Sequence, residues 1–480
     1  MLFAALSWFC SAAQGAAGKD KLSVEFNENI ATYSIVERLV ADKEGKLFYI
    51  DGKAEDDYLP MVDRAFNELS KYDNSKIIGQ TLDYLKVTGS QQDLTYQVLL
   101  RANAFPLPGF KYGFNDLAAD SLKINAAKAY VDSLRQFYQD RSLKKFFADQ
   151  SYFIKGALQE VRRNLPVNYV NKMEKYYGET ILAFKFYINP FDAVPYEPEF
   201  WHGNGPKIKT KNGWIANMIS SAYLPLKKEP SLRNYKTFGF NKRETINFLI
   251  THEFGHSFVN QTLEPYEDRI NKSADLISSG LNEKMNPQGY GYWPVCVAEH
   301  LVRLGEIRIA EANHDLKKAA ELRKLHIRNY SFVLIPEFEK KIVEYEKNRN
   351  KYKTFGDFVP RLLTILDSVT VDDLRKKLGL SIVKYKVTVE LQVPNMNDDA
   401  YIAGNLYPLG NWNPQKTKMT RASDFTRTIT FQTYPDVKIK FTRGSWETEG
   451  IVAGYEDGNN IEIKPYRDST YNFEVLNWKN

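Results

Sequence analysis

The sequence predicts an α+β protein in which a mainly helical domain with a small sheet is followed by an all-β sandwich. Apolar residues recur at three- and four-residue intervals through much of the first part of the chain, which is the period of amphipathic helices. From residue 385 onward this helical period is absent. Short segments in which apolar and polar residues alternate, separated by Gly, Pro and Asn, are typical of a β-sandwich. We therefore divide the chain into residues 1–18, 19–384 and 385–480.

The composition of the 480 residues is that of a globular protein with a sizeable core, with 43% hydrophobic and 26% charged residues. Lys and Arg exceed Asp and Glu by only six, 65 against 59, and form no long basic run, so we expect no nucleic-acid partner. Beyond the N-terminal run, no stretch approaches the roughly 18 to 20 apolar residues of a membrane span, so we expect no transmembrane segment.

An apolar run and then a stretch of small residues open the chain, at residues 2–10 and 11–16. This order is typical of a signal peptide, so it predicts export to the periplasm, the cell surface or the medium. A lipid anchor on Cys10 is the alternative, although bulky aromatic residues stand where such a signal has small ones.

After removal of the signal peptide, Cys296 is the one remaining cysteine, so no internal disulfide can form. Its apolar neighbours predict a buried side chain.

The elements of the long domain follow from its hydrophobic periods. One or two strands are expected over residues 22–47 and helices over residues 61–150. Apolar segments bounded by turn signals at residues 181–188 and 213–219 predict strands of the small sheet. The second of these could bind substrate as an added strand or could be a plain core strand. Further helices should cover residues 243–260, 294–310, 315–325 and 336–348.

The third quarter of the chain starts with a motif that carries chemistry, His252-Glu253-Phe254-Gly255-His256. On a helix, two histidines four residues apart project from one face and can share a metal ion. Glu253 stands beside them and can act as general base on a water molecule that the metal polarises. The motif therefore predicts zinc held by His252 and His256.

The surroundings of this motif predict a buried helix. Ile246, Leu249, Ile250 and Phe254 form an apolar stripe at helical spacing. Gly255 inside such a helix costs about 1 kcal/mol relative to alanine. We therefore expect another element to pack close against the backbone at Gly255.

A catalytic zinc usually has three protein ligands, so a third must come from elsewhere. Thr262 stands where the metzincin motif has its third histidine, which leaves a carboxylate. We choose Glu299, in a helix that begins at Pro294 and whose apolar neighbours would bury it. Glu306, seven residues further on and on nearly the same face, is the alternative.

Peptide hydrolysis also needs a hydrogen-bond donor for the oxyanion of the transition state. The candidates are His300 and Arg303, which flank Glu299, together with Tyr290 and Tyr292. His300 and Arg303 could contact substrate or could anchor the site from behind.

Residues 252–260 and 298–303 resemble segments of a family of secreted bacterial zincin-like proteins, catalogued mostly as a domain of unknown function. The similarity spans roughly residues 20–380, and its strong motifs are these two. It implies a gluzincin-like fold, in which a second helix supplies a glutamate, and peptidase activity. It supplies no known substrate.

The segments around Trp412 and Trp446 resemble starch-binding modules, carbohydrate-binding module family 20. That resemblance implies an immunoglobulin-like sandwich in which the two tryptophans stack on sugar rings and Lys440 and Asn459 add hydrogen bonds. The alternative is that both tryptophans belong to the core or rim and that the module only spaces or docks the enzyme.

These features predict a secreted zinc peptidase that acts on a protein or peptide and that its sandwich directs to a glycan or glycoprotein. Two alternatives stay open. One is an idle zincin-like domain in a protein that binds carbohydrate or attaches to a surface, and the other is hydrolysis of a non-peptide amide or ester. An intact Glu253 favours an active centre over an idle one.

Overall fold

The computed structural model describes residues 21–44, 59–72, 75–89, 92–117, 119–192 and 203–479, so the expected signal peptide lies outside the described residues. Helices and strands are mixed along the chain, which confirms the α+β prediction. The chain forms two compact units, residues 1–171 with 180–254 and residues 172–179 with 255–480. The division falls inside α9 (Arg243–Leu263), so this continuous helix contributes to both units.

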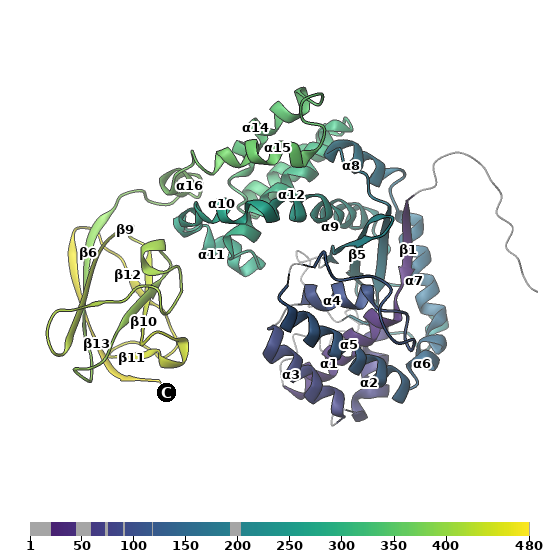
Figure 1. Ribbon diagram of the computed structural model, residues 1–480, viewed down its shortest axis with the longest axis horizontal. Coiled ribbons are helices and arrows are strands. Elements are labelled where there is room, and N and C mark those ends of the chain that lie inside the picture. Colours follow the sequence, from purple (N-terminus) through teal and green to yellow (C-terminus); the bar gives the residue numbers. More distant parts are fainter. Residues whose placement is uncertain are drawn as a thin grey trace, which may run out of the picture. The chain divides into compact units, whose positions relative to one another are not determined.

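The first unit begins with a helical bundle, coloured purple and dark blue in Figure 1. Within residues 21–44 the expected one or two strands reduce to one, β1 (Leu22–Phe26), because Asn27 caps a helix there and accepts the backbone N–H groups of Asn29 and Ile30. The helices of this part are α1 (Glu28–Lys43), α2 (Pro60–Leu69), α3 (Lys76–Thr88), α4 (Gln92–Arg101), α5 (Ser121–Asp140), α6 (Leu143–Asp149) and α7 (Ser151–Asn164).

The same unit contains the small sheet, in the order β1-β2-β5-β3 with β4 also paired to β5. Its further strands are β2 (Ala183–Asn189), β3 (Gly203–Asn204), β4 (Lys207–Thr210) and β5 (Gly213–Ser221). β5 is parallel to β2 on one side and antiparallel to β3 and β4 on the other. Since both edges of β5 are paired, the idea that it takes up a substrate strand is wrong, and the core-strand alternative holds.

The first half of α9 packs on this sheet. The ring of Phe254 meets that of Phe184 in β2 edge-on, with 5.1 Å between centroids. Before β4, the backbone of Gly205 lies so close to α9 that a Cβ atom there would be 2.2 Å from the carbonyl oxygen of Glu253. Glycine therefore allows the strand connection to run directly over the helix at Glu253.

The second unit carries the remaining helices, of which α12 matters most for the site. These are part of α8 (Tyr169–Tyr177), then α10 (Glu267–Asn271), α11 (Asn282–Met285), α12 (Trp293–Ala312), α13 (Leu316–Arg323), α14 (Ile335–Lys347), α15 (Phe355–Leu362) and α16 (Val371–Lys377). A Cβ atom at Gly255 would lie 3.2 Å from Val302 Cγ1, and one at Gly305 would lie 2.0 Å from the Tyr177 hydroxyl. The close packing expected at Gly255 is therefore confirmed, and α12 is the element that makes it.

Two sheets form the C-terminal sandwich, in the orders β12-β10-β7 and β11-β13-β6-β9-β8. Their strands are β6 (Tyr385–Gln392), β7 (Tyr401–Gly404), β8 (Thr420–Arg421), β9 (Thr426–Thr433), β10 (Val437–Thr442), β11 (Gly450–Val452), β12 (Ile461–Ile463) and β13 (Ser469–Trp478). Alternate residues of β6, Val387, Val389 and Leu391, are buried in a core shared by both sheets. The predicted change from helix to strand thus occurs at Tyr385.

Among the helices in the described ranges, none combines the length and the apolar content that a membrane crossing requires.

Candidate metal centre

The His-Glu-x-x-His motif lies in α9, as predicted, and its two histidines meet a carboxylate from α12. His252, His256 and Glu299 each offer one ligand atom, and these atoms lie within 4.8 Å of one another. Ligand atoms about 2.0–2.1 Å from a tetrahedral ion are roughly 3.3 Å apart. His256 Nε2 and Glu299 Oε1 are 3.1 Å apart. The donor set, two imidazoles and a carboxylate, therefore fits a divalent metal ion.

Neighbouring turns of α9 orient both imidazoles. The ring of Phe248 stacks on that of His252, with an interplanar angle of 9°. His256 Nδ1 lies 3.1 Å from Asn260 Oδ1. When the Nδ1–H group donates a hydrogen bond to Asn260 Oδ1, the lone pair of Nε2 lies on the side of Glu299, where a metal ion would bind. Asn260 is a site residue that the sequence analysis missed, and its position four residues after His256 was the available signal.

Glu253 is buried in α9, directly after His252. By helical geometry its side chain projects about 60° from that of His256 around the axis of α9, so it borders the face that carries the two histidines. The backbone contact with Gly205 fixes α9 at this residue.

The structure decides between the two candidates for the third ligand. Glu299 joins the cluster with His252 and His256. Glu306 points elsewhere, since Oε1 lies 3.1 Å from Arg303 Nη1 and Oε2 lies 2.8 Å from His326 Nε2. Glu299 is thus the carboxylate of the candidate metal centre, and Glu306 is outside it.

His300 is completely buried beside Glu299. Its Nδ1 lies 2.7 Å from the carbonyl oxygen of Cys296, and its ring meets that of Phe332 edge-on at 4.9 Å. Burial lowers the pKa of His300 to about 4, although the Cys296 carbonyl and Glu299 act in the opposite direction. This placement favours the anchoring role over substrate contact. Cys296 itself is buried, as expected, and burial raises the pKa of its thiol.

Arg303 lies between two carboxylates and is 8% exposed. Its Nη1 is 3.1 Å from Glu306 Oε1, whereas its Nε is 3.8 Å from Glu299 Oε2. Burial acts to lower the pKa of the guanidinium, but Glu306, Tyr290 and Glu299 outweigh it and raise the pKa above its usual value. Arg303 is therefore a permanent cation behind the candidate ligand Glu299, with Tyr290 hydrogen-bonded to it.

Tyr292 precedes α12 and is 56% exposed. Its hydroxyl donates a hydrogen bond of 2.8 Å to Glu267 Oε1 at the start of α10. That bond raises the pKa of Tyr292, with burial adding to the effect. A role for Tyr292 toward an oxyanion stays a prediction.

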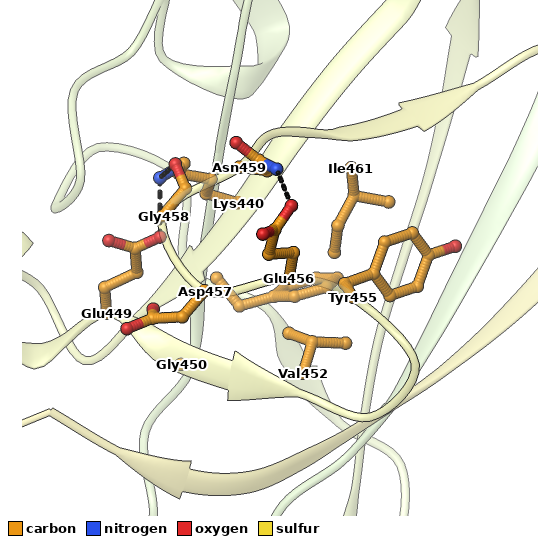
Figure 2. A pocket seen from close by; sticks show the side chains of 11 residues that line it. Lys440, Glu449, Gly450, Val452, Tyr455, Glu456, Asp457, Gly458, Asn459 and Ile461 are labelled. Carbon is orange, nitrogen blue, oxygen red and sulfur yellow. Dashed lines mark hydrogen bonds and ion pairs between the residues drawn. The ribbon is translucent and has the colours of Figure 1, made fainter.

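In the sandwich, the two tryptophans and the two proposed hydrogen-bonding residues lie in different settings. Trp446 is 39% exposed and Trp412 is partly exposed. Figure 2 shows a surface hollow that Lys440 and Asn459 help to line, and neither tryptophan is among its lining residues. Lys440 Nζ donates to Glu449 and to the carbonyl of Gly458, at 2.6 and 2.8 Å. Asn459 donates to Glu456 at 2.9 Å, so both groups already have partners inside the module.

Fold and cluster together define an α+β protein with a candidate metal centre of two histidines and one glutamate. Residues 117–365, just over half of the chain, match the family model described as Domain of unknown function (DUF4932). The chain therefore belongs to this family, and the matched region contains α9, α12 and the whole cluster. No curated protein and no solved structure matches the chain.

Proposed function

We propose that the protein is an exported zinc peptidase of the gluzincin type, with His252, His256 and Glu299 as zinc ligands. The observation that carries the proposal is the convergence of these three side chains from α9 and α12. Two neutral imidazoles, one carboxylate and an adjacent Glu253 are the groups that hydrolytic zinc sites use.

In the proposed reaction each residue has one task. His252, His256 and Glu299 would hold the zinc ion, which would supply a Lewis acid for a water molecule and for the carbonyl group of the scissile bond. Glu253 accepts a proton from the attacking water and passes it to the leaving amide nitrogen, so that a carboxylate and an amine result. Asn260 keeps His256 in the tautomer that coordinates through Nε2. Burial of Glu299 and His252 keeps solvent from competing for them.

The experiment compares zinc content and cleavage of an unfolded protein substrate for the mature wild type, Glu253→Gln and Glu299→Ala. We expect one zinc per chain in the wild type and in Glu253→Gln, and loss of zinc in Glu299→Ala. Cleavage should fall roughly 10²- to 10⁴-fold in Glu253→Gln, the range for loss of a general base. A wild type without zinc, or a Glu253→Gln protein that cleaves normally, contradicts the proposal.

The same proteins separate the two alternatives. A wild type that binds zinc and leaves peptides intact, but hydrolyses small esters or other amides in a Glu253-dependent way, would be a hydrolase of non-peptide substrates. A zinc-binding protein without any hydrolysis would favour the idle, attachment-type protein.

For the sandwich we propose binding of α-glucan chains through Trp412 and Trp446. Support comes from the partial exposure of both rings and from the bond that ties their loops together at the end of β10, Thr442 Oγ1 to the Pro414 carbonyl at 2.6 Å. Binding of the full chain to soluble starch should be lost in Trp446→Ala. It should persist in Tyr466→Ala, which removes an aromatic side chain that is 74% exposed elsewhere in the module. Equal binding by both variants contradicts this role.

A further inference from the structure

Behind the candidate metal cluster, α12 carries a second buried carboxylate, Glu306, which is 1% exposed. It contacts Arg303 through Oε1 and His326 through Oε2, at 3.1 and 2.8 Å. Arg303 in turn lies 3.8 Å from the Oε2 atom of Glu299. A continuous row of polar side chains thus leads from the cluster through Arg303 and Glu306 to His326.

Arg303 lies closer to Glu306 than to Glu299, and electrostatic attraction explains this difference. A guanidinium next to a buried carboxylate tends to form a direct, forked ion pair with it. Such a pair with Glu299 would occupy the oxygen atoms that a metal ion needs and would cancel their charge. The carboxylate of Glu306 attracts the same guanidinium more closely, at 3.1 Å against 3.8 Å, and so competes with Glu299 for it.

His326 fixes the competing carboxylate. It belongs to a π-helical segment, Lys324–Asn329, and such segments are rare and frequent at functional sites. His326 is fully buried, and its Nε2–H can donate to Glu306 Oε2. With Oε2 held there, Oε1 remains directed at Arg303. The ring of Phe332 closes the group, edge-on to His326 at 6.2 Å and 5.7 Å from the Arg303 guanidinium.

We propose that Glu306 and His326 are positioning residues of the metal centre, which hold Arg303 back from Glu299 so that Glu299 stays available as a ligand. This inference rests on the proposed metal site and is independent of the substrate.

The test measures zinc affinity of the full chain by competition with a chromogenic chelator. Glu306→Gln removes the charge that holds Arg303 and keeps the shape of the side chain. We expect zinc binding to weaken about 10- to 100-fold, the range for changes behind metal ligands. Glu311→Gln is the matched control, because it removes a carboxylate from the same helix that pairs with Arg308 and Arg323 instead. The control should bind zinc like the wild type.

A double variant separates positioning from general damage. If Arg303 weakens the site by moving onto Glu299, then Arg303→Met combined with Glu306→Gln should bind zinc more tightly than Glu306→Gln alone. Cobalt(II) in place of zinc adds a spectroscopic readout, since its visible absorption bands report the ligand geometry. The bands should shift in Glu306→Gln and return toward the wild-type spectrum in the double variant.

Equal zinc affinity of the wild type and Glu306→Gln overturns the inference, and so does a double variant no better than Glu306→Gln. If Glu306→Gln does not fold, His326→Leu replaces it, because it removes the donor to Glu306 and should weaken zinc binding in the same direction. A wild type that binds no zinc contradicts the proposed metal site itself, and the inference fails with it.

Discussion

Two groups of charged residues on α12 lie in different surroundings. In the first, the buried group, Glu299, Arg303 and Glu306 are buried, and two carboxylates face one guanidinium. In the second, the partly exposed group, Arg308 and Glu311 join a network with Arg323 of α13 and with Glu339 and Glu346 of α14. Water screens the second group, whereas the first depends on each partner it has.

The difference separates a group of charges that contributes to stability from one suited to metal binding. A partly exposed network tolerates the loss of one member better than a buried group does, because water can solvate the remaining charges. A buried group with more negative than positive charge is costly unless a cation completes it. A divalent ion held by Glu299 would supply that positive charge, which is consistent with the proposed metal site.

The largest effect is expected from Glu306→Ala. The substitution leaves the Arg303 guanidinium buried without its nearest carboxylate, which typically costs about 3–5 kcal/mol of unfolding free energy. Urea unfolding of the metal-free protein measures it. A cost below about 1 kcal/mol, the value for an exposed pair, would remove the distinction between the two groups.

Lowering the pH should destabilise the surroundings of the buried group first. Burial lowers the pKa of His300 to about 4 from the usual 6.5, so the unfolded chain takes up this proton at a higher pH than the folded one. The stability linked to neutral His300 is then fully present above about pH 6.5. It decreases as the pH drops toward 4, by at most about 3 kcal/mol. The pKa of His326 is also lowered by burial, against the effect of Glu306, and acts in the same direction.

The measurement is urea unfolding of the chelated protein between pH 7 and 4, for the wild type and His300→Gln. In the partly exposed group, burial acts to raise the pKa of Glu339, but Arg323 and Arg308 outweigh it, so the stability that Glu339 contributes is lost only as the pH falls below about 4.5. If the unfolding free energy of His300→Gln falls with pH between 6.5 and 4 as steeply as that of the wild type, this histidine does not cause the loss of stability in acid.

A metal ion should stabilise the fold through Glu299 of the buried group and not through the partly exposed group. Zinc at about 100 times its dissociation constant adds about 2.7 kcal/mol if only the folded chain binds it. Thermal unfolding with zinc and with a chelator measures the difference. Glu299→Ala should abolish the gain, whereas a gain that survives this substitution would place zinc at another site.

The smallest effect is expected from Glu311→Ala in the partly exposed group, less than about 1 kcal/mol. High salt should reduce even this difference, because pairs that solvent reaches are screened. A large cost would mean that the network around Arg308 is as essential as the buried group.

Much of the fold follows from local patterns. The helices α5 and α9 correspond to the strong helical periods around Val131 and Ile246. Strand β6 begins at Tyr385, where the sequence pattern changes from the helical period to apolar–polar alternation. The helix α1 was missed because polar residues such as Thr32 and Ser34 are buried in it together with the apolar ones, which hides the period of 3.6, and the capping residue Asn27 was the clearer signal.

The candidate site was predictable to the extent that its chemistry is local in sequence. Two histidines four residues apart must share a face of a helix, so His252 and His256 required no structure. Glu299 could be chosen by its setting, but its separation from Glu306 required the packing of α12. His326 lies beyond any sequence pattern, since a π-helical turn brings it to Glu306.

The contact between His256 and Asn260 has a practical consequence for producing the protein. Asn260-Gln261-Thr262 is an acceptor sequence for N-linked glycosylation, and Asn260 is exposed. Secretion from a eukaryotic host would present this amide to the oligosaccharide transferase and place a bulky sugar one helical turn from His256. Expression in a bacterial host avoids the modification, and a Thr262→Ala protein, which loses the acceptor sequence but keeps Asn260, would serve where a eukaryotic host is required.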